Sequence, residues 1–378
     1  MSEKVHFHRA RNPDSEKYDS TRIPTRPLGE FSTFITTQLP HLLAGIRDGS
    51  YTHQDLEGTI DSLLPSVEST RSLVGSDLKT ARLDAQFAYN ALVHVANLEN
   101  KKNNTSIAYV PGAHISALAG ELAQRTGRPR ILTYEDVVID NPVQDMRTFG
   151  SGRIGDSERG FYHAHLLIEQ RLQVTIELMM ALIARLEQGD YESDDQIAAA
   201  TKMNEHWKAV NRHTSNLKND LPASDFLIFR NYLGAFIDPD TIGKGDVKLS
   251  GASGQGSSRL RATDFLLGGD TLIGNEGFMN DTKSLLPYYP VSDIDQFQRI
   301  LQMAYEGRTL HRLMQGVDRS SKLHVLINKF AGLKVGWRHL HQHAVRTQMP
   351  DVVEGTGGTQ LEEYLDMCIE ATKRSYHG

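Results

Sequence analysis

The spacing of apolar residues predicts helices along most of the chain, because these residues recur every three to four positions. The clearest stripe lies between residues 333 and 348 and is formed by Leu333, Trp337, Leu340, Ala344, Val345 and Gln348. His341 falls within this stripe, so we expect its side chain to be buried. His339 and His343 lie about 200° from it around a helix, and we expect both on the opposite face.

Two long segments show the same helical period. Residues 76–98 carry apolar side chains every three to four positions. Residues 160–185 are apolar on most sides, which is typical of a central buried helix. Asp156 or Ser157 is the expected N-cap of this second helix, since a short polar side chain can accept a hydrogen bond from its first turn.

Shorter segments complete the helical pattern. Residues 196–219 and 259–268 read as two further helices. The apolar run 131–139 is too short for its period to separate strand from helix, and Pro142 limits its extension. We therefore expect an all-α protein.

The composition of the connecting segments predicts the domain organisation. Residues 1–30 are polar and interrupted by prolines, so we expect an N-terminal arm. The stretch 147–155 has the glycine-rich composition of a flexible linker. It divides a small N-terminal helical domain, residues 31–150, from a large helical domain, residues 151–378.

Length and charge exclude several classes of protein. The chain has 378 residues, a net charge of -6 and a pI near 6.2, and no Lys/Arg run longer than a pair, which argues against a nucleic-acid partner. Its single cysteine, Cys368, excludes an intrachain disulfide and a Cys-rich metal site. No apolar run approaches the length of a membrane span. We expect a cytoplasmic protein without a membrane partner, a monomer or small homo-oligomer.

Two histidines on apolar stripes are candidates for chemistry. His341 lies in an apolar wall with the glycine-rich loop 355–359 just beyond it, which suits a single axial ligand of haem iron. The alternative is a core histidine bonded to a backbone carbonyl. His165 shares a stripe with Phe161, and its alternative is a helix histidine paired with Glu169 one turn on.

Arg230 interrupts an apolar segment, and a buried guanidinium requires a carboxylate partner. That partner is either a substrate carboxylate, which the guanidinium fork fits, or another residue of the protein; a snorkelling surface arginine is the third reading. The loop 250–258 consists mostly of glycine and serine and fits no nucleotide-binding motif. Small residues held between helices allow close approach of a flat ligand.

A metal-hydrolase reading rests on His339 and His343, which are spaced i, i+4. Zinc enzymes with this spacing carry the sequence His-Glu-x-x-His, which is absent, and no third ligand suggests itself.

The motif Trp337-Arg338-x-x-His341, followed by Gly-Thr-Gly-Gly-Thr at 355–359, resembles the proximal-histidine helix and C-terminal loop of the indoleamine 2,3-dioxygenase and tryptophan 2,3-dioxygenase superfamily. The similarity to indoleamine 2,3-dioxygenase extends from about Leu39 to the C-terminus, with its blocks in the family's order. It implies a large helical domain that binds haem b, a small domain that covers the substrate side, and O2 as co-substrate.

The resemblance also implies a set of site residues. His341 would be the proximal iron ligand. Further cofactor contacts are implied for Gly251, Ser253, Gly254 and Trp337. Substrate contacts are implied for Tyr134, Val138, Phe161, Tyr162, Phe226, Arg230, Ala252 and Thr356. Catalytic roles are implied for His165, Arg230 and Ser253.

His165 departs from the mammalian-type indoleamine dioxygenase pattern, which has a small serine there, and agrees with tryptophan 2,3-dioxygenases, which have a distal histidine. The implied reaction is insertion of O2 across the indole C2–C3 bond of tryptophan or a related indole, giving N-formylkynurenine-type products. Alternatives are mono-oxygenation or oxidative rearrangement of an aromatic amino acid, as in the related pyrrolnitrin-pathway enzyme, and a non-catalytic haem gas sensor.

Overall fold

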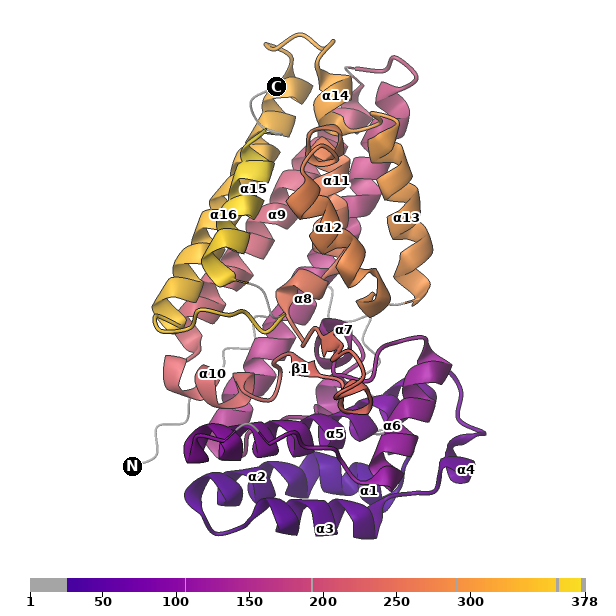
Figure 1. Ribbon diagram of the computed structural model, residues 1–378. Coiled ribbons are helices and arrows are strands. Elements are labelled where there is room, and N and C mark those ends of the chain that lie inside the picture. Colours follow the sequence, from indigo (N-terminus) through magenta and orange to yellow (C-terminus); the bar gives the residue numbers. More distant parts are fainter. Residues whose placement is uncertain (1–25, 106, 192, 290, 358–359, 375–378) are drawn as a thin grey trace.

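The computed structural model describes residues 26–105, 107–191, 193–289, 291–357 and 360–374. Within them the chain is mainly helical, with one antiparallel pair of short strands, β1 (Phe236–Ile237) and β2 (Lys248–Leu249) (Figure 1). The expectation of an all-α fold is therefore confirmed. Residues 1–25 of the expected arm lie outside the described residues. None of the described helices combines the length and apolar character needed to span a bilayer.

The N-terminal helices form a layer across one end of the molecule (Figure 1). They are α1 (Glu30–Thr33), a π-helical turn (Phe34–Gln38), α2 (Leu39–Asp48), α3 (His53–Leu63), α4 (Val67–Thr70), α5 (Gly75–Asn103), α6 (Ala113–Thr126), α7 (Tyr134–Val138) and a 3-10 turn (Val143–Asp145). The helix predicted over 76–98 is α5, which is buried on nearly all sides in its middle. The ambiguous run 131–139 contains the short helix α7, which starts with a capping box between Thr133 and Asp136.

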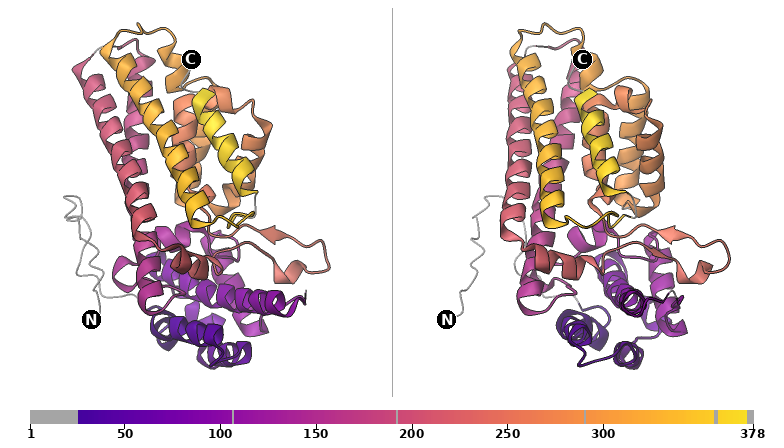
Figure 2. Two further views of the ribbon diagram at one scale, coloured as in Figure 1. Left: turned by 90° about the vertical axis from the view of Figure 1, so that its left-hand side faces the viewer. Right: turned by 60° about the vertical axis from the view of Figure 1, so that its left-hand side comes forward.

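Three long helices, α8 (Gly152–Leu186), α9 (Asp194–Asp220) and α15 (Lys322–Gln348), pack side by side and rise from this layer (Figure 2). The remaining helices are α10 (Ala223–Arg230), α11 (Ser258–Leu272), α12 (Glu276–Leu285), α13 (Val291–Tyr305), α14 (Leu310–Met314) and α16 (Leu361–Arg374). Three 3-10 turns occur at Pro239–Thr241, Gly254–Gly256 and Leu286–Tyr288. The predicted helices 196–219 and 259–268 correspond to α9 and α11.

Helix α8 connects two hydrophobic cores. Its first turns contribute Tyr162 and Leu166 to the core of the N-terminal helices. From Ile168 onward its apolar side chains belong to a second core with α9, α11, α13 and α15. A single rigid helix therefore fixes the position at which the two cores meet.

The segment 147–155 is not the flexible linker that its composition indicated. Arg147 and Phe149 are fully buried, and Arg147 forms an ion pair with Asp84 inside the N-terminal core. The backbone N–H groups of Phe149 and Gly150 donate to the buried Glu158 carboxylate. Helix α8 consequently begins at Gly152, earlier than the expected caps Asp156 and Ser157.

The glycines of this segment serve close packing. A Cβ on Gly155 would lie 2.5 Å from the carbonyl oxygen of Gly150, so a side chain there would push the first turn of α8 away from the preceding segment. Gly152 has φ +54°, a left-handed conformation that a side chain disfavours. Sequence composition cannot separate glycines that give flexibility from glycines that allow contact.

Candidate functional site

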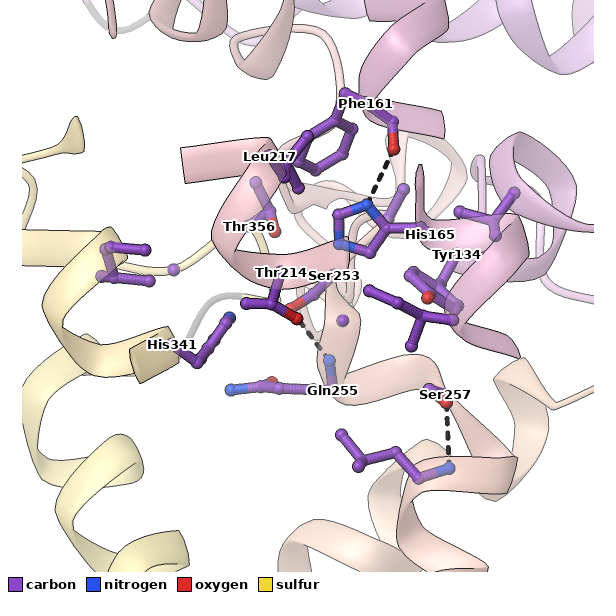
Figure 3. Close-up of a pocket in the computed structure, with 18 of the residues that line it drawn as sticks. Tyr134, Phe161, His165, Thr214, Leu217, Ser253, Gln255, Ser257, His341 and Thr356 are labelled. Atoms are coloured by element: carbon purple, nitrogen blue, oxygen red, sulfur yellow. Dashed lines mark hydrogen bonds between the residues drawn. The ribbon is translucent and has the colours of Figure 1, made fainter. Parts of the chain in front are cut away.

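A cavity lies where α7, α8, α9, α10 and α15 meet the loop 252–257 (Figure 3). Its volume is about 210 Å³. Pockets for drug-sized ligands typically hold about 300–1,000 Å³, so this cavity is smaller than most of them. Its lining is mainly apolar, with a few polar groups placed among aromatic and aliphatic side chains.

Most of the predicted site residues line this single cavity, although they come from segments far apart in the sequence. They are Tyr134, Val138, Phe161, His165, Phe226, Arg230, Ala252, Ser253, Gly254, Trp337, His341 and Thr356. Two predicted contacts, Tyr162 and Gly251, are not among the lining residues.

Tyr162 and Gly251 lie outside the cavity lining, so the ligand contacts expected for them stay predictions. Tyr162 is fully buried, and its hydroxyl donates to Glu158 at 2.7 Å. Gly251 N–H donates to the carbonyl of Thr356 at 3.2 Å, and a Cβ on Gly251 would overlap the Leu233 carbonyl oxygen. Gly251 therefore allows the loop carrying Thr356 to dock.

His341 lies on α15 and points into the cavity (Figure 3). Its ring stacks on Trp337, with centroids 5.3 Å apart, and the Trp337 indole donates to Thr214 at 2.8 Å. Among the described residues none forms a hydrogen bond with this imidazole. Burial lowers the pKa of His341, and the nearby Arg338 and His165 lower it further, to about 4. The ring is therefore neutral at pH 7, and one of its nitrogens has a free lone pair. The alternative of a core histidine held by a carbonyl is not what is found.

His339 and His343 of α15 are exposed, as the stripe predicted for the face opposite His341. The described residues contain no group of three or more His, Cys, Asp or Glu side chains placed to hold a metal ion. His339 and His343 thus have no third ligand in this part of the chain, and the zinc-hydrolase reading has no support.

The buried face of α15 carries charges that the predicted stripe missed. Asp264 of α11 accepts from Lys334 and from Arg338, each at 2.7 Å. Burial alone would raise the pKa of Asp264, but the two cations outweigh it and lower the pKa. Lys334 and Arg338 are spaced i, i+4 beside Trp337, and Asp264 begins an apolar run; that combination is the signal that could have found the pair.

We call the buried side of the cavity around α15 the α15 wall, formed by Trp337, Arg338 and His341 with Lys334 and Asp264 behind them. Opposite it lies the α8 wall, formed by Tyr134, His165, Glu169 and Ser257.

His165 presents an acceptor nitrogen from the α8 wall. Its Nδ1 lies 2.8 Å from the carbonyl oxygen of Phe161, and since a carbonyl can only accept, Nδ1 carries the hydrogen (Figure 3). Burial lowers the pKa of His165, so the ring is neutral and its Nε2 carries no hydrogen. The bond to Phe161 takes the place of the pairing with Glu169 that the sequence offered as an alternative.

Glu169 is the main cavity residue that sequence reasoning missed as a site residue. It is 1% exposed, and its Oε1 accepts hydroxyl hydrogens from Tyr134 at 3.0 Å and Ser257 at 2.6 Å. Burial raises the pKa of its carboxyl, while the Ser257 hydrogen bond, Arg259 and Tyr134 oppose the rise. A carboxylate one helical turn beyond His165 on the same face is a signal that the sequence does contain.

Arg230 lies at the end of α10, on the cavity lining, and is half-buried. One guanidinium nitrogen donates to the carbonyl of Glu354 at 2.6 Å. No carboxylate of the described residues lies within ion-pair distance of Arg230. Its aromatic neighbours, Phe161 and Phe226, pack with centroids 5.3 Å apart and form an apolar wall next to this cation.

The C-terminal loop closes one side of the cavity. Besides the Gly251–Thr356 hydrogen bond, the Ser250 hydroxyl donates to the carbonyl of Gly357 at 3.2 Å, and Lys248 pairs with Glu354 at 2.7 Å. Thr356 lines the cavity, and no described residue forms a hydrogen bond with its side chain. Gly358 and Thr359 of the predicted motif lie outside the described residues.

The residues present fit a haem. A porphyrin supplies four nitrogens to its iron, so one protein imidazole suffices, and His341 is a neutral, half-buried imidazole on the cavity lining without hydrogen bonds to the described residues. Ala252 and Gly254, both on the lining, leave space for a flat ring. No protein-family model matches the chain, and a search of curated proteins finds no match to it.

Proposed function

We propose that the protein is a haem-dependent dioxygenase that inserts O2 across the C2–C3 bond of tryptophan or a related indole. The observation that carries the proposal is a pair of neutral histidines on opposite walls of one apolar cavity: His341, whose imidazole is free of hydrogen bonds to the described residues, and His165, fixed as an acceptor.

His341 would hold haem b as its axial ligand, and Trp337 would fix the plane of the imidazole by stacking. The Arg338–Asp264 ion pair, one helical turn from Lys334, keeps this part of α15 against α11. When bound, the haem supplies an iron that reacts with O2, which protein side chains alone cannot do. The other residues of the site would position the substrate.

Arg230 and Thr356 would bind the amino-acid end of the substrate. The Arg230 guanidinium has no carboxylate partner in the described chain, and a bidentate bond to a substrate carboxylate satisfies it. The Thr356 hydroxyl is available to accept from the substrate ammonium group. Both groups lie on the cavity lining with the aromatic side chains Phe161 and Phe226, against which an indole can pack.

His165 would orient the indole ring. Its Nε2 accepts a hydrogen bond, and the indole N–H is the one donor on the ring of tryptophan. Fixing the ring at its N–H and at the amino-acid end leaves one orientation for the C2–C3 bond. Val138 and Tyr134 complete the wall beside the ring. Ser253, whose hydroxyl oxygen accepts from Gln255 N–H at 3.4 Å, would hold the shape of the loop between cofactor and substrate.

The hydrogen-bond donors of the α8 wall favour ring cleavage over mono-oxygenation or rearrangement. Mono-oxygenation releases one oxygen atom as water and needs protons and a reductant, yet the Nδ1 hydrogen of His165 and the Tyr134 hydroxyl hydrogen are both committed to acceptors of the protein. A gas sensor needs no cation for a substrate carboxylate, so Arg230 weighs against that alternative.

The test is an absorption spectrum of the haem-loaded protein with and without L-tryptophan under 18O2. We expect a Soret band, growth of a formylkynurenine band, and a product mass that contains two labelled oxygen atoms. A product with one labelled atom would favour mono-oxygenation. Tight gas binding without turnover of any indole would favour the sensor.

A further inference from the structure

Glu169 accepts two hydroxyl hydrogens through one oxygen atom. Tyr134 of α7 and Ser257, the N-cap of α11, both donate to its Oε1, and both line the cavity. Ser257 also accepts from Leu260 N–H at 3.1 Å, which leaves its hydroxyl hydrogen directed at Glu169. The carboxyl group thus draws two O–H groups of the cavity wall toward the protein interior.

Charged groups from every adjoining helix surround Glu169. Glu135 of α7 is fully buried and Asp293 of α13 is partly buried, while Arg259 of α11 is the cation closest to them. The Oε2 atoms of Glu135 and Glu169 are buried without hydrogen-bond partners. Burial and the neighbouring carboxylates raise the pKa of both glutamates.

The direction of the two hydrogen bonds does not depend on this titration. If Glu169 gains a proton, the free Oε2 can carry it, and Oε1 remains a carbonyl oxygen that accepts from both hydroxyls. His165 Nε2 also lacks a hydrogen, because Nδ1 donates to Phe161. The α8 wall therefore presents an acceptor, His165 Nε2, to a ligand, while the hydroxyl hydrogens of Tyr134 and Ser257 are bonded to Glu169.

We propose that Glu169 is a specificity-determining positioning residue, which makes the α8 wall select aromatic rings whose edge carries an N–H over rings whose edge carries only an acceptor. The inference rests on the proposed function, since it concerns the same cavity and an indole-like ligand. Without the carboxyl group, the hydroxyls of Tyr134 and Ser257 lose their acceptor and turn toward the ligand, so the wall becomes a donor as well.

The test compares L-tryptophan with its benzofuran analogue, in which an oxygen atom replaces the ring N–H. Dissociation constants are measured by calorimetry on the haem-loaded protein, so the readout is binding and not turnover. The wild type should bind L-tryptophan about tenfold to a hundredfold more tightly, because the benzofuran oxygen faces an unsatisfied acceptor. In Glu169→Leu this ratio should fall at least about tenfold, since the released hydroxyls can donate to the furan oxygen.

Two variants separate this effect from a structural defect. Glu169→Gln keeps a carbonyl oxygen for both hydroxyls and places its amide nitrogen toward Glu135, so the ratio should stay within about twofold of the wild type. Adding Tyr134→Phe and Ser257→Ala to Glu169→Leu removes the released donors and should restore the preference. Circular dichroism shows whether each variant is folded.

A folded Glu169→Leu variant with the wild-type ratio would overturn the inference while leaving the proposed function intact. If Glu169→Leu does not fold, the same ratio of dissociation constants is measured for Tyr134→Phe and tests the inference. Its ratio should match the wild type, because the hydroxyl hydrogen does not reach the ligand; a larger preference for L-tryptophan would mean that Tyr134 donates to ligands, contrary to the inference. A wild-type protein that binds neither compound would refute the proposed function itself.

Discussion

The two walls of the cavity use buried polar groups in different ways. On the α15 wall, the buried carboxylate Asp264 meets two cations, Lys334 and Arg338. On the α8 wall, the buried carboxyl of Glu169 meets neutral hydroxyl groups, and its second oxygen has no hydrogen-bond partner. On the α15 wall the cations outnumber the carboxylate, whereas on the α8 wall the Glu169 carboxyl keeps one oxygen without a hydrogen-bond partner.

We infer from this difference that the α15 wall mainly stabilises the fold, whereas the α8 wall has groups left to bind a ligand. Paired charges hold α15 against α11, and His341 presents its imidazole to the cavity from the same wall. On the other side of the cavity, His165 Nε2 and the Arg230 guanidinium can still bond. Under the proposed function, the cofactor would bind at His341 and the substrate on the opposite side of the cavity.

Replacing the two histidines gives the largest contrast. We expect His341→Ala to abolish stoichiometric haem binding, because no other described residue of the α15 wall offers a nitrogen to the iron. His165→Ala should keep full haem content, since under the proposed function that ring contacts the substrate and not the haem iron. Haem is measured by its absorbance per protein chain. His339→Ala, an exposed histidine of the same helix, is the matched control; normal haem content in His341→Ala would remove it as the ligand.

The buried carboxyls should differ in their effect on stability. Asp264→Ala leaves Lys334 and Arg338 without their partner, and loss of one member of a buried ion pair costs about 3–5 kcal/mol. Glu169→Leu removes a carboxyl that forms no ion pair but leaves the Tyr134 and Ser257 hydroxyls without their acceptor, so the free energy of unfolding should fall by only about 1–3 kcal/mol. Urea denaturation of haem-free protein measures both. Equal losses in the two variants would contradict the distinction between the walls.

The two arginines on the cavity lining also differ, because Arg338 pairs with Asp264 whereas Arg230 has no carboxylate partner among the described residues. Arg230→Ala should weaken binding of L-tryptophan about tenfold to a hundredfold, as expected for a lost charge-assisted hydrogen bond, and should leave plain indole unaffected. Calorimetry with both compounds measures the difference. Lys248→Ala, whose ammonium pairs with Glu354 on the same loop, is the control. Similar losses for indole and tryptophan would dismiss the carboxylate clamp.

The helical fold could be predicted from the sequence because it depends on the period of apolar residues. The same rule placed His339 and His343 on the exposed face of their helix, and it predicted a buried His341, which is half-buried because it faces the cavity. The convergence of distant segments on one cavity was expected only from the resemblance, since a period within a helix says nothing of contacts between helices. The burial of 147–155 was missed because glycine composition is the same in a linker and in a tight contact.

The polar interior was the least predictable part. Lys334 and Arg338 lie on a face that an apolar stripe should occupy, and only their contact with Asp264 on another helix makes them stable there. Glu169 could be placed near His165 by spacing, but its hydroxyl partners come from α7 and α11. Pairings across helices depend on tertiary structure, which local patterns do not encode.

The smallest expected effect is a pH dependence of opposite sign for the two carboxyls. Burial raises the folded-state pKa of Glu169 above its ordinary 4.5, so the native state holds more protons, and stability falls as the pH rises above about 4.5. The cations lower the pKa of Asp264 below 3.8, so its contribution is present above that pH and is lost as the pH falls through the folded-state value.

Glu169→Gln should therefore gain stability relative to the wild type between pH 5 and 8, by no more than about 1.4 kcal/mol per pH unit for one proton. Asp264→Asn should instead approach the wild type as the pH falls below about 4, because the wild type then loses the ion pair that the variant lacks. Urea denaturation across this pH range measures both differences. Two curves that diverge in the same direction would mean that Glu169 is neutralised as fully as Asp264, and the α8 wall would then lose its distinction from the α15 wall.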